Sequence, residues 1–262
     1  MQRSPLYTIL FATAVSIVCA VVVSSAAVSL KERQEINSAL EKQRNVLIAA
    51  GLLGNEEKVS PEEIENRFET IRGVVIDLET GEEAPDIDPR TFDQKREATD
   101  PTTSRAAPAN PALVKRLPDH ALIYLVRGRD GEIDMIILPV EGYGLWSTLY
   151  GFLALDADLE TVRGITFYEH KETPGLGGEV DNPDWKAKWD GRKVFGDDGV
   201  PRIEVIKGQA GPAVEDPYRV DGLSGATLTS RGVTNLVQFW LGENGFGPLL
   251  QKLGSRAERR AA

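Results

Sequence analysis

The chain has 262 residues, which is long enough for one sizeable domain and additional segments. Its formal net charge of −10 argues against a nucleic acid as partner. A single cysteine, Cys19, provides neither an internal disulfide nor a cysteine-ligated zinc or iron–sulfur site. The two histidines, His120 and His170, are too few for a multi-histidine metal centre, so we predict no metal site. Redox or transfer chemistry in this chain therefore needs an organic cofactor.

Residues 7–30 form an uninterrupted uncharged run rich in Val, Ala, Ile and Leu. At about 1.5 Å per residue, a helix of this length spans the hydrocarbon core of a bilayer, which is roughly 30 Å thick. The small residues 24–27 also fit the cleavage site of a secretory signal peptide. The run is longer than a usual signal core, which favours a retained transmembrane helix after a short N-terminus of residues 1–6.

The charged residues that flank this run bear on its orientation in the membrane. Arg3 precedes it, and several positive residues follow it, namely Lys31, Arg33, Lys42 and Arg44. A count of positive charges would place the C-terminal side inside the cell, although large polar domains translocate largely regardless of such counts.

Residues 31–119 are predicted to form a membrane-proximal region of helix and strand. We expect the first helix to continue to about Ala50, a short helix to begin at the capping sequence Ser60-Pro61-Glu62-Glu63, and a strand to cover 71–78. Residues 82–111 are polar and proline-rich without apolar periodicity. They are predicted to be a long surface loop or a wrap over another subunit.

Residues 120–253 are predicted to form the main domain, followed by a tail at 254–262. The expected strands are 121–126 and 133–138 around a turn at 128–131, then 152–155 and 162–168, then 203–206. The expected helical segments are 183–189, the helix after residue 229, and 246–253. Strands joined by hairpins and flanked by helices predict an α+β domain with mainly antiparallel pairing, after a single transmembrane helix.

Residues 221–230 consist mostly of small residues and lead into an amphipathic helix. The apolar residues that follow recur at helical spacing, at Val233, Leu236, Val237, Trp240 and Leu241. The helix is therefore expected to begin at Thr229 or Ser230. A loop of small residues before a helix N-terminus offers unpaired N–H groups to a phosphate. An ordinary capped loop has the same geometry and is commoner.

The sequence Asp221-x-x-Ser224-Gly225-Ala226-Thr227 resembles the flavinylation motif of the FMN-binding domain family of bacterial membrane redox complexes. The resemblance implies that a flavin transferase joins Thr227 to the phosphate of FMN through a phosphoester. It also implies that Gly225 and Ala226 leave room for the phosphate and for the transferase. Asp221 would be part of the motif that the transferase recognises, and Ser224 would belong to the same cofactor site.

A second stretch, residues 169–178, holds closely spaced glycines after a predicted strand. It is not a dinucleotide-binding fingerprint, and it is at least a turn forced by Pro174 and the glycines. The backbone at Gly175 and Gly177 could approach a flat cofactor ring, and Leu176 offers it an apolar surface. Thr173 and Glu172 could form hydrogen bonds with the heteroatom edge of the ring. The stretch resembles the His-Lys-Glu-Thr-Pro-Gly-Leu-Gly segment of the same family, which lies against the isoalloxazine.

A third stretch, residues 141–152, contains four aromatic residues and three glycines. Tyr150 and Phe152 are expected in the core, whereas Gly142, Leu145 and Trp146 are candidates for cofactor contact. With the residues up to 164, this stretch resembles the NqrC family, the flavin-bearing component of the Na⁺-translocating NADH:quinone oxidoreductases. The sibling RnfG family of the Rnf complexes shares the flavin motifs but lacks the Gly-Leu-Trp-Ser-Thr run and the long N-terminal portion.

Three isolated side chains have an ordinary interpretation beside the functional one. Lys207 could neutralise a phosphate or a reduced flavin, and Arg231 could pair with a phosphate, but either could be a solvated surface residue. His170 is expected to help position its loop, and no proton transfer is assigned to it.

The resemblance implies an electron-carrier subunit of a Na⁺-pumping NADH:ubiquinone reductase, in which covalent FMN relays single electrons. Implied partners are the other subunits of the complex, the flavin transferase and the membrane. The N-terminus would lie in the cytoplasm and the domain in the periplasm, on the bacterial inner membrane. The alternatives are an Rnf-type subunit and an anchored scaffold without flavin. The uncharged helix offers no carboxylate for an ion path, so no sodium site is predicted.

Overall fold

The computed structural model describes residues 4–128 and 131–261, and its chain divides into two compact units, residues 1–42 and 43–262. The tip of the predicted turn, Arg129 and Asp130, lies outside the described residues. So do residues 1–3 of the predicted N-terminus and residue 262 of the predicted tail.

The first unit contains most of helix α1, Pro5–Ala49. The predicted continuation of the apolar helix to about Ala50 is confirmed, because α1 runs unbroken through the charged residues after Leu30. In the described part of the chain, α1 is the one helix that is long and apolar enough to cross a membrane. Its apolar window is not buried in the protein, which fits a single-pass anchor.

The end of α1 belongs to the second unit and is closed by a glycine. Gly51 has a φ of +68°, which a residue without Cβ adopts at no steric cost. The N–H of Leu52 donates to the carbonyl of Leu47 at 2.9 Å, and the N–H of Gly51 donates to that of Ile48 at 3.0 Å. This is a Schellman motif, which ends the helix at a defined residue.

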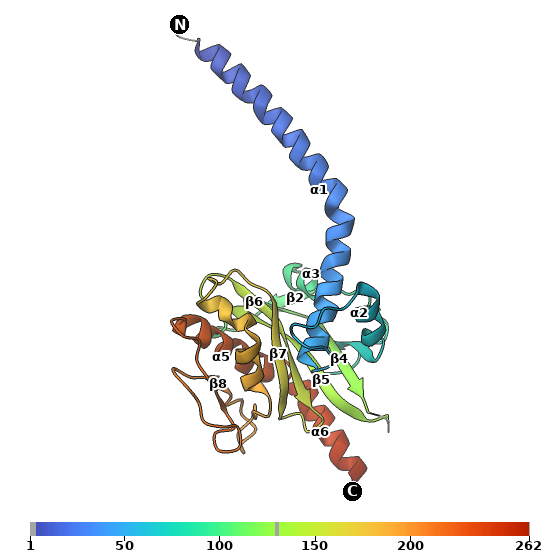
Figure 1. Cartoon of the computed structure of the whole chain (residues 1–262). Helices are drawn as coiled ribbons and strands as arrows, with labels where there is room; N and C mark the ends of the chain where they lie inside the picture. Colours follow the sequence, from blue (N-terminus) through green and yellow to red (C-terminus); the bar gives the residue numbers. More distant parts are fainter. Residues whose placement is uncertain (1–3, 129–130, 262) are drawn as a thin grey trace. The chain divides into compact units, whose positions relative to one another are not determined.

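A five-stranded antiparallel sheet forms the centre of the second unit (Figure 1). Its strands are β1 (Ile71–Asp77), β4 (His120–Arg127), β5 (Ile133–Tyr143), β6 (Thr148–Asp156) and β7 (Val162–Glu169), in the order β1-β4-β5-β6-β7. The predicted α+β class with mainly antiparallel pairing is confirmed. The boundary predicted at residue 120 is wrong, since β1 pairs with β4 along its whole length and belongs to the same sheet.

Helices α5 (Thr227–Leu241) and α6 (Gly247–Ala261) contribute to the core on one face of the sheet. Alternate residues of β5, such as Ile136 and Leu138, are fully buried in the same cluster as Leu236 and Trp240 of α5. The indole Nε1 of Trp240 also donates to the carbonyl of Glu141 in β5, at 2.7 Å. The last turns of α5 are therefore fixed to the sheet by packing and by a hydrogen bond.

The opposite face of the sheet is covered by the end of α1 and by α2 (Pro61–Phe68). Thr166 of β7 donates its hydroxyl to the carbonyl of Asn45 at 3.3 Å, and the Phe68 ring meets that of Tyr124 edge-on with centroids 5.6 Å apart. Tyr124 in turn contacts Phe152 at 5.9 Å. The sheet is thus buried on both faces, which explains its long apolar strands.

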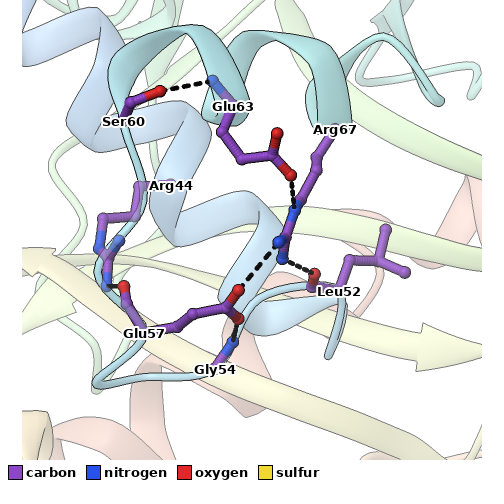
Figure 2. A network of polar contacts seen from close by, with 7 residues as sticks. All are labelled: Arg44, Leu52, Gly54, Glu57, Ser60, Glu63 and Arg67. Carbon is purple, nitrogen blue, oxygen red and sulfur yellow. Dashed lines mark hydrogen bonds and ion pairs between the residues drawn. The ribbon is translucent and has the colours of Figure 1, made fainter.

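Figure 2 shows the polar network that holds α2 to the end of α1. As predicted, Ser60 caps α2, and its hydroxyl accepts from the N–H of Glu63 at 3.3 Å with proline at the first helical position. The Glu63 carboxylate, however, accepts from Arg67 at 2.8 Å. Arg67 also donates to Glu57 at 2.8 Å, and Arg44 donates to the carbonyl of Glu57 at 2.9 Å.

Residues 82–111 are not an irregular loop throughout, so that prediction is wrong in part. They contain α3 (Gln94–Thr99) and β2 (Ser104–Ala106), and β2 pairs with β3 (Arg116–Pro118). The side chain of Gln94 accepts from the N–H of Leu122 in β4 at 3.1 Å, so the segment wraps over its own sheet. A helix of six residues is too short to show the apolar period on which the prediction relied.

The remaining elements pack beside β7 and α5. They are η1 (Gly177–Asp181), α4 (Pro183–Lys186), η2 (Ala187–Trp189), β8 (Glu204–Val205) and β9 (Arg219–Val220), with β8 and β9 parallel. Trp185 and Trp189 are buried, as expected for a short helix packed on the body. The helical turn predicted at 246–253 extends into the segment predicted to be a tail, because α6 continues to Ala261.

Candidate functional site

Helix α5 begins at Thr227, two residues earlier than the predicted start at Thr229 or Ser230. The alternative of an ordinary capped loop requires a Thr or Ser hydroxyl at the N-cap. Instead, the Ser230 hydroxyl accepts from the N–H of Leu223 at 3.0 Å, and the Thr229 hydroxyl donates to a buried carboxylate. The residue at the cap position is Ala226, and no side chain among the described residues caps the first turn. The first N–H groups of α5 therefore remain available to an anion.

Thr227 is exposed at this uncapped end, as are Ser224 and Gly225, whereas Ala226 is buried. Gly225 has a φ of +70°, and a Cβ added there would lie 3.0 Å from Leu176 Cδ2. The structure therefore brings the predicted attachment residue beside the second predicted stretch, although about fifty residues separate them in the sequence.

The second stretch is joined to the site by Glu172, whose carboxylate is buried. Its Oε1 accepts from three successive backbone N–H groups, those of Leu145 at 3.1 Å, Trp146 at 2.9 Å and Ser147 at 3.3 Å. Its Oε2 accepts from the Thr229 hydroxyl at 2.7 Å. Burial by itself would raise the pKa of Glu172, but these donors outweigh it and lower that pKa, so the group is ionised.

The carboxylate oxygens of Glu172 thus serve the protein itself, and its predicted hydrogen bond to a cofactor ring stays a prediction. Sequence reasoning missed Thr229 as its partner, because no spacing rule connects residues 172 and 229. Gly177 was predicted to approach a flat ring, but it is buried next to the contact between Glu172 and Thr229. A Cβ there would lie 2.5 Å from Thr229 Oγ1 and 2.7 Å from Glu172 Oε2.

His170 holds the start of this loop, in agreement with the prediction. Its Nε2 lies 2.8 Å from Asp181 Oδ2, and its Nδ1 accepts from the N–H of Glu172 at 3.2 Å. The hydrogen bond with Asp181 raises the pKa of His170. The imidazole thus connects the loop to η1 and orients the backbone of Glu172.

Four apolar side chains are exposed on the elements that meet at Glu172 or at the start of α5. They are Leu145 (36% exposed), Trp146 (65%), Leu176 (44%) and Leu228 (52%). The first three were predicted as cofactor contacts. Leu228 was missed, although the sequence contains a signal for it: this leucine lies outside the helical spacing of the buried residues of α5. Together these side chains could cover a flat, partly apolar ligand next to Thr227.

Two predicted glycine contacts differ in their surroundings. Gly142 is buried beneath α5, where a Cβ would lie 2.5 Å from Leu236 Cβ, and its contact with a cofactor stays a prediction. Gly175, with a φ of +73°, is exposed and has open space around its missing Cβ. Thr173 is exposed and its carbonyl accepts from the N–H groups of Leu176 and Gly178, which forms the turn.

Asp221 fixes the loop before the attachment residue. Its Oδ2 lies 2.5 Å from Lys188 Nζ, its Oδ1 accepts from the N–H of Ala210 at 2.8 Å, and its carbonyl accepts from Trp185 Nε1 at 2.8 Å. Burial alone would raise the pKa of Asp221, but Lys188 and the Ala210 N–H lower it. The predicted phosphate partners Lys207 and Arg231 are both exposed, which fits either of the interpretations given above.

Comparison with known proteins identifies this site as part of a known domain. Residues 144–242 match the family model of the FMN-binding domain. The chain is 50% identical over 249 residues to the C subunit of the Na⁺-translocating NADH-quinone reductase of Yersinia pestis, covering 94% of this chain and 92% of the relative. It is 48% identical over 256 residues to the protein of the same name from Pseudomonas aeruginosa, covering 96% and 97%.

The fold is also that of solved structures. The crystal structure of NqrC from Shewanella oneidensis superposes with a TM-score of 0.75 at 33% identity, covering 81% of this chain and 96% of that one. The corresponding reductase subunit from Parabacteroides distasonis gives a TM-score of 0.64 at 26% identity, covering 84% and 96%. The chain therefore belongs to the NqrC family of the Na⁺-translocating NADH-quinone reductases, and it is a subunit of an oxidoreductase complex.

Proposed function

We propose that this subunit carries single electrons through FMN joined by a phosphoester to Thr227. The observation that carries the proposal is the exposed hydroxyl-bearing residue at the uncapped start of α5. A phosphate bonded to this residue would lie where, in the described part of the chain, no side chain caps the first N–H groups of the helix. Gly225 adds no side chain of its own beside the ester, and its φ of +70° is one that glycine adopts without strain.

The exposed apolar side chains would receive the ring system. Leu176 packs on Gly225, and Trp146 and Leu145 are held by the same carboxylate that binds α5. Bound FMN would supply a ring that can accept and donate single electrons, and the protein would set its position and potential. The residues of this chain bind the phosphate, orient the ring and exclude water from part of its surface.

The attachment is a group transfer to the Thr227 oxygen. The Thr227 hydroxyl oxygen forms a bond with the FMN phosphorus of a flavin dinucleotide, and the bond from this phosphorus to the bridging oxygen of the diphosphate breaks. The hydroxyl proton leaves to solvent or to a base of the flavin transferase, and a nucleoside monophosphate is released. No change of oxidation state occurs in this step.

The subunit is further proposed to work on the outer side of the bacterial inner membrane, in the company of the other subunits of a sodium-pumping complex. The apolar helix α1 supports a single-pass anchor. The family supports a periplasmic domain, whereas the count of flanking positive charges favours the reverse orientation. Protease digestion of intact spheroplasts distinguishes the two, because a periplasmic domain is cleaved without lysis.

Mass spectrometry of the peptide that contains residues 221–230 tests the attachment. The full-length chain is produced with and without the flavin transferase, and the Thr227→Ala and Thr227→Ser variants are compared with it. We expect an FMN adduct on Thr227, and a flavin-fluorescent band in a denaturing gel, that require the transferase and disappear in Thr227→Ala. The serine variant keeps a hydroxyl and controls for loss of the threonine methyl. A chain without adduct in the presence of active transferase would favour the scaffold alternative.

A further inference from the structure

A single buried side chain connects three segments of the site. Glu172 belongs to the loop that carries Leu176, it accepts from the backbone of the turn that carries Trp146, and it accepts from Thr229, two residues after Thr227 in α5. Each of these segments bears a residue to which the proposed function assigns a flavin contact or the flavin bond. Their relative positions therefore depend on one carboxylate.

The surroundings of this carboxylate leave it little freedom to move. A Cβ at Gly144 would lie 2.7 Å from Glu172 Oε1, and a Cβ at Gly177 would lie 2.7 Å from Oε2. A Cβ at Gly232, one turn further along α5, would lie 2.5 Å from the carbonyl oxygen of Tyr143. The turn, the loop and the helix approach one another at glycines, so a displacement of the carboxylate moves their backbones.

The negative charge of the Glu172 carboxylate strengthens its hydrogen bonds to the turn and to α5. Three successive N–H groups that point to one oxygen form an arrangement that favours an anion. A hydrogen bond to a charged acceptor is stronger than one between neutral groups. Removing Thr229 as a donor would leave a buried carboxylate oxygen without that partner, which is costly.

We propose that Glu172 and Thr229 form a positioning pair that holds the turn at 145–147 and the loop at 173–177 against the first turn of α5. The pair sets where Trp146 and Leu176 lie relative to the flavin on Thr227, without contact between the pair and the ring being required. This inference rests on the proposed attachment at Thr227. It assigns to the two residues control over the mobility and the surroundings of the flavin ring.

The test uses the full-length chain in detergent, loaded by the flavin transferase, with flavin content measured by mass spectrometry. Thr229→Val removes the hydroxyl at nearly constant volume, and Thr229→Ser restores it. Thr234→Val is the matched control, because Thr234 lies in the same helix and its hydroxyl accepts from the N–H of Val205 at 2.8 Å, outside the site. The time-resolved anisotropy of the flavin fluorescence reports the mobility of the ring. The quantum yield reports how strongly Trp146 quenches that fluorescence.

We expect Thr229→Val to carry flavin whose anisotropy acquires a fast component and whose quenching is partly lost. Thr229→Ser should regain the wild-type fluorescence, and Thr234→Val should keep it even if its thermal stability falls. Unchanged anisotropy and yield in loaded Thr229→Val would overturn the positioning role. If Thr229→Val does not fold, Glu172→Asp, which keeps the charge and withdraws the oxygens, should show the same loss, and unchanged values would again overturn it.

The outcome for the wild-type chain separates this inference from the proposed function. A wild-type chain that remains free of flavin in the presence of active transferase would refute the attachment, and the positioning role would fall with it. A loaded wild-type chain with unaltered fluorescence in the variants would refute the positioning role alone.

Discussion

Replacement of Gly232 by alanine tests how closely α5 packs on the turn that follows β5. The added Cβ would lie 2.5 Å from the carbonyl oxygen of Tyr143 and 2.9 Å from Gly144 Cα. Both are backbone atoms that no rotamer change can move. Ordinary contact begins near 3.4 Å, so relief needs a relative shift of about 0.9 Å between helix and turn. Overpacking of this kind costs about 1–3 kcal/mol.

Alanine also favours the helix, by about 1 kcal/mol relative to glycine. Gly254→Ala in α6 is the matched control, because its added Cβ meets no atom within 4 Å. Both variants share the helix propensity gain, so the difference between their free energies of unfolding isolates the overpacking term, about 1–3 kcal/mol. Urea titration followed by tryptophan fluorescence measures both. Equal stability of the two variants would refute the close approach.

Two further predictions concern charged groups. Burial raises the pKa of Glu141 from 4.5 to about 7, although the positive charge of Lys95 acts to lower it. Between these two pH values the folded chain holds a proton that the unfolded chain has released. Stability should therefore fall by about 3 kcal/mol as pH rises from 4.5 to about 7, and urea titrations of Glu141→Gln should lack this slope. Lys188→Met removes the ionic partner of Asp221 and should slow flavin incorporation at Thr227, with recovery in Lys188→Arg. Equal incorporation rates in gel-fluorescence time courses would contradict it.

The sequence predicts well those features that depend on local periodicity. The apolar helix, the hairpin strands and the burial of Trp185 and Trp189 agree with the structure, because each has an apolar pattern or a turn signal of its own. The membership of β1 in the sheet could not be predicted, since it depends on pairing with β4 across a separation of more than forty residues. The short α3 has fewer than two helical turns, which is too few to show an apolar periodicity.

The start of α5 shows why the site was predicted only in part. Thr229 and Ser230 are good capping residues, but each hydroxyl forms a tertiary hydrogen bond, so the helix begins at Thr227 without a cap. Glu172 is a loop carboxylate whose partners lie 25 to 57 positions away in the chain. Such long-range pairings follow from the fold, and a single sequence carries no signal for them.

The two ends of α5 are fastened by different means to the same part of the sheet. Near its start, Thr229 is bound to the carboxylate that also holds the turn after β5, and near its end Trp240 is bound to Glu141 within β5. A group on the first turn of this helix is therefore tied to the body of the domain at both ends of the helix. We expect any movement of Thr227 toward another protein to carry the five-stranded sheet with it.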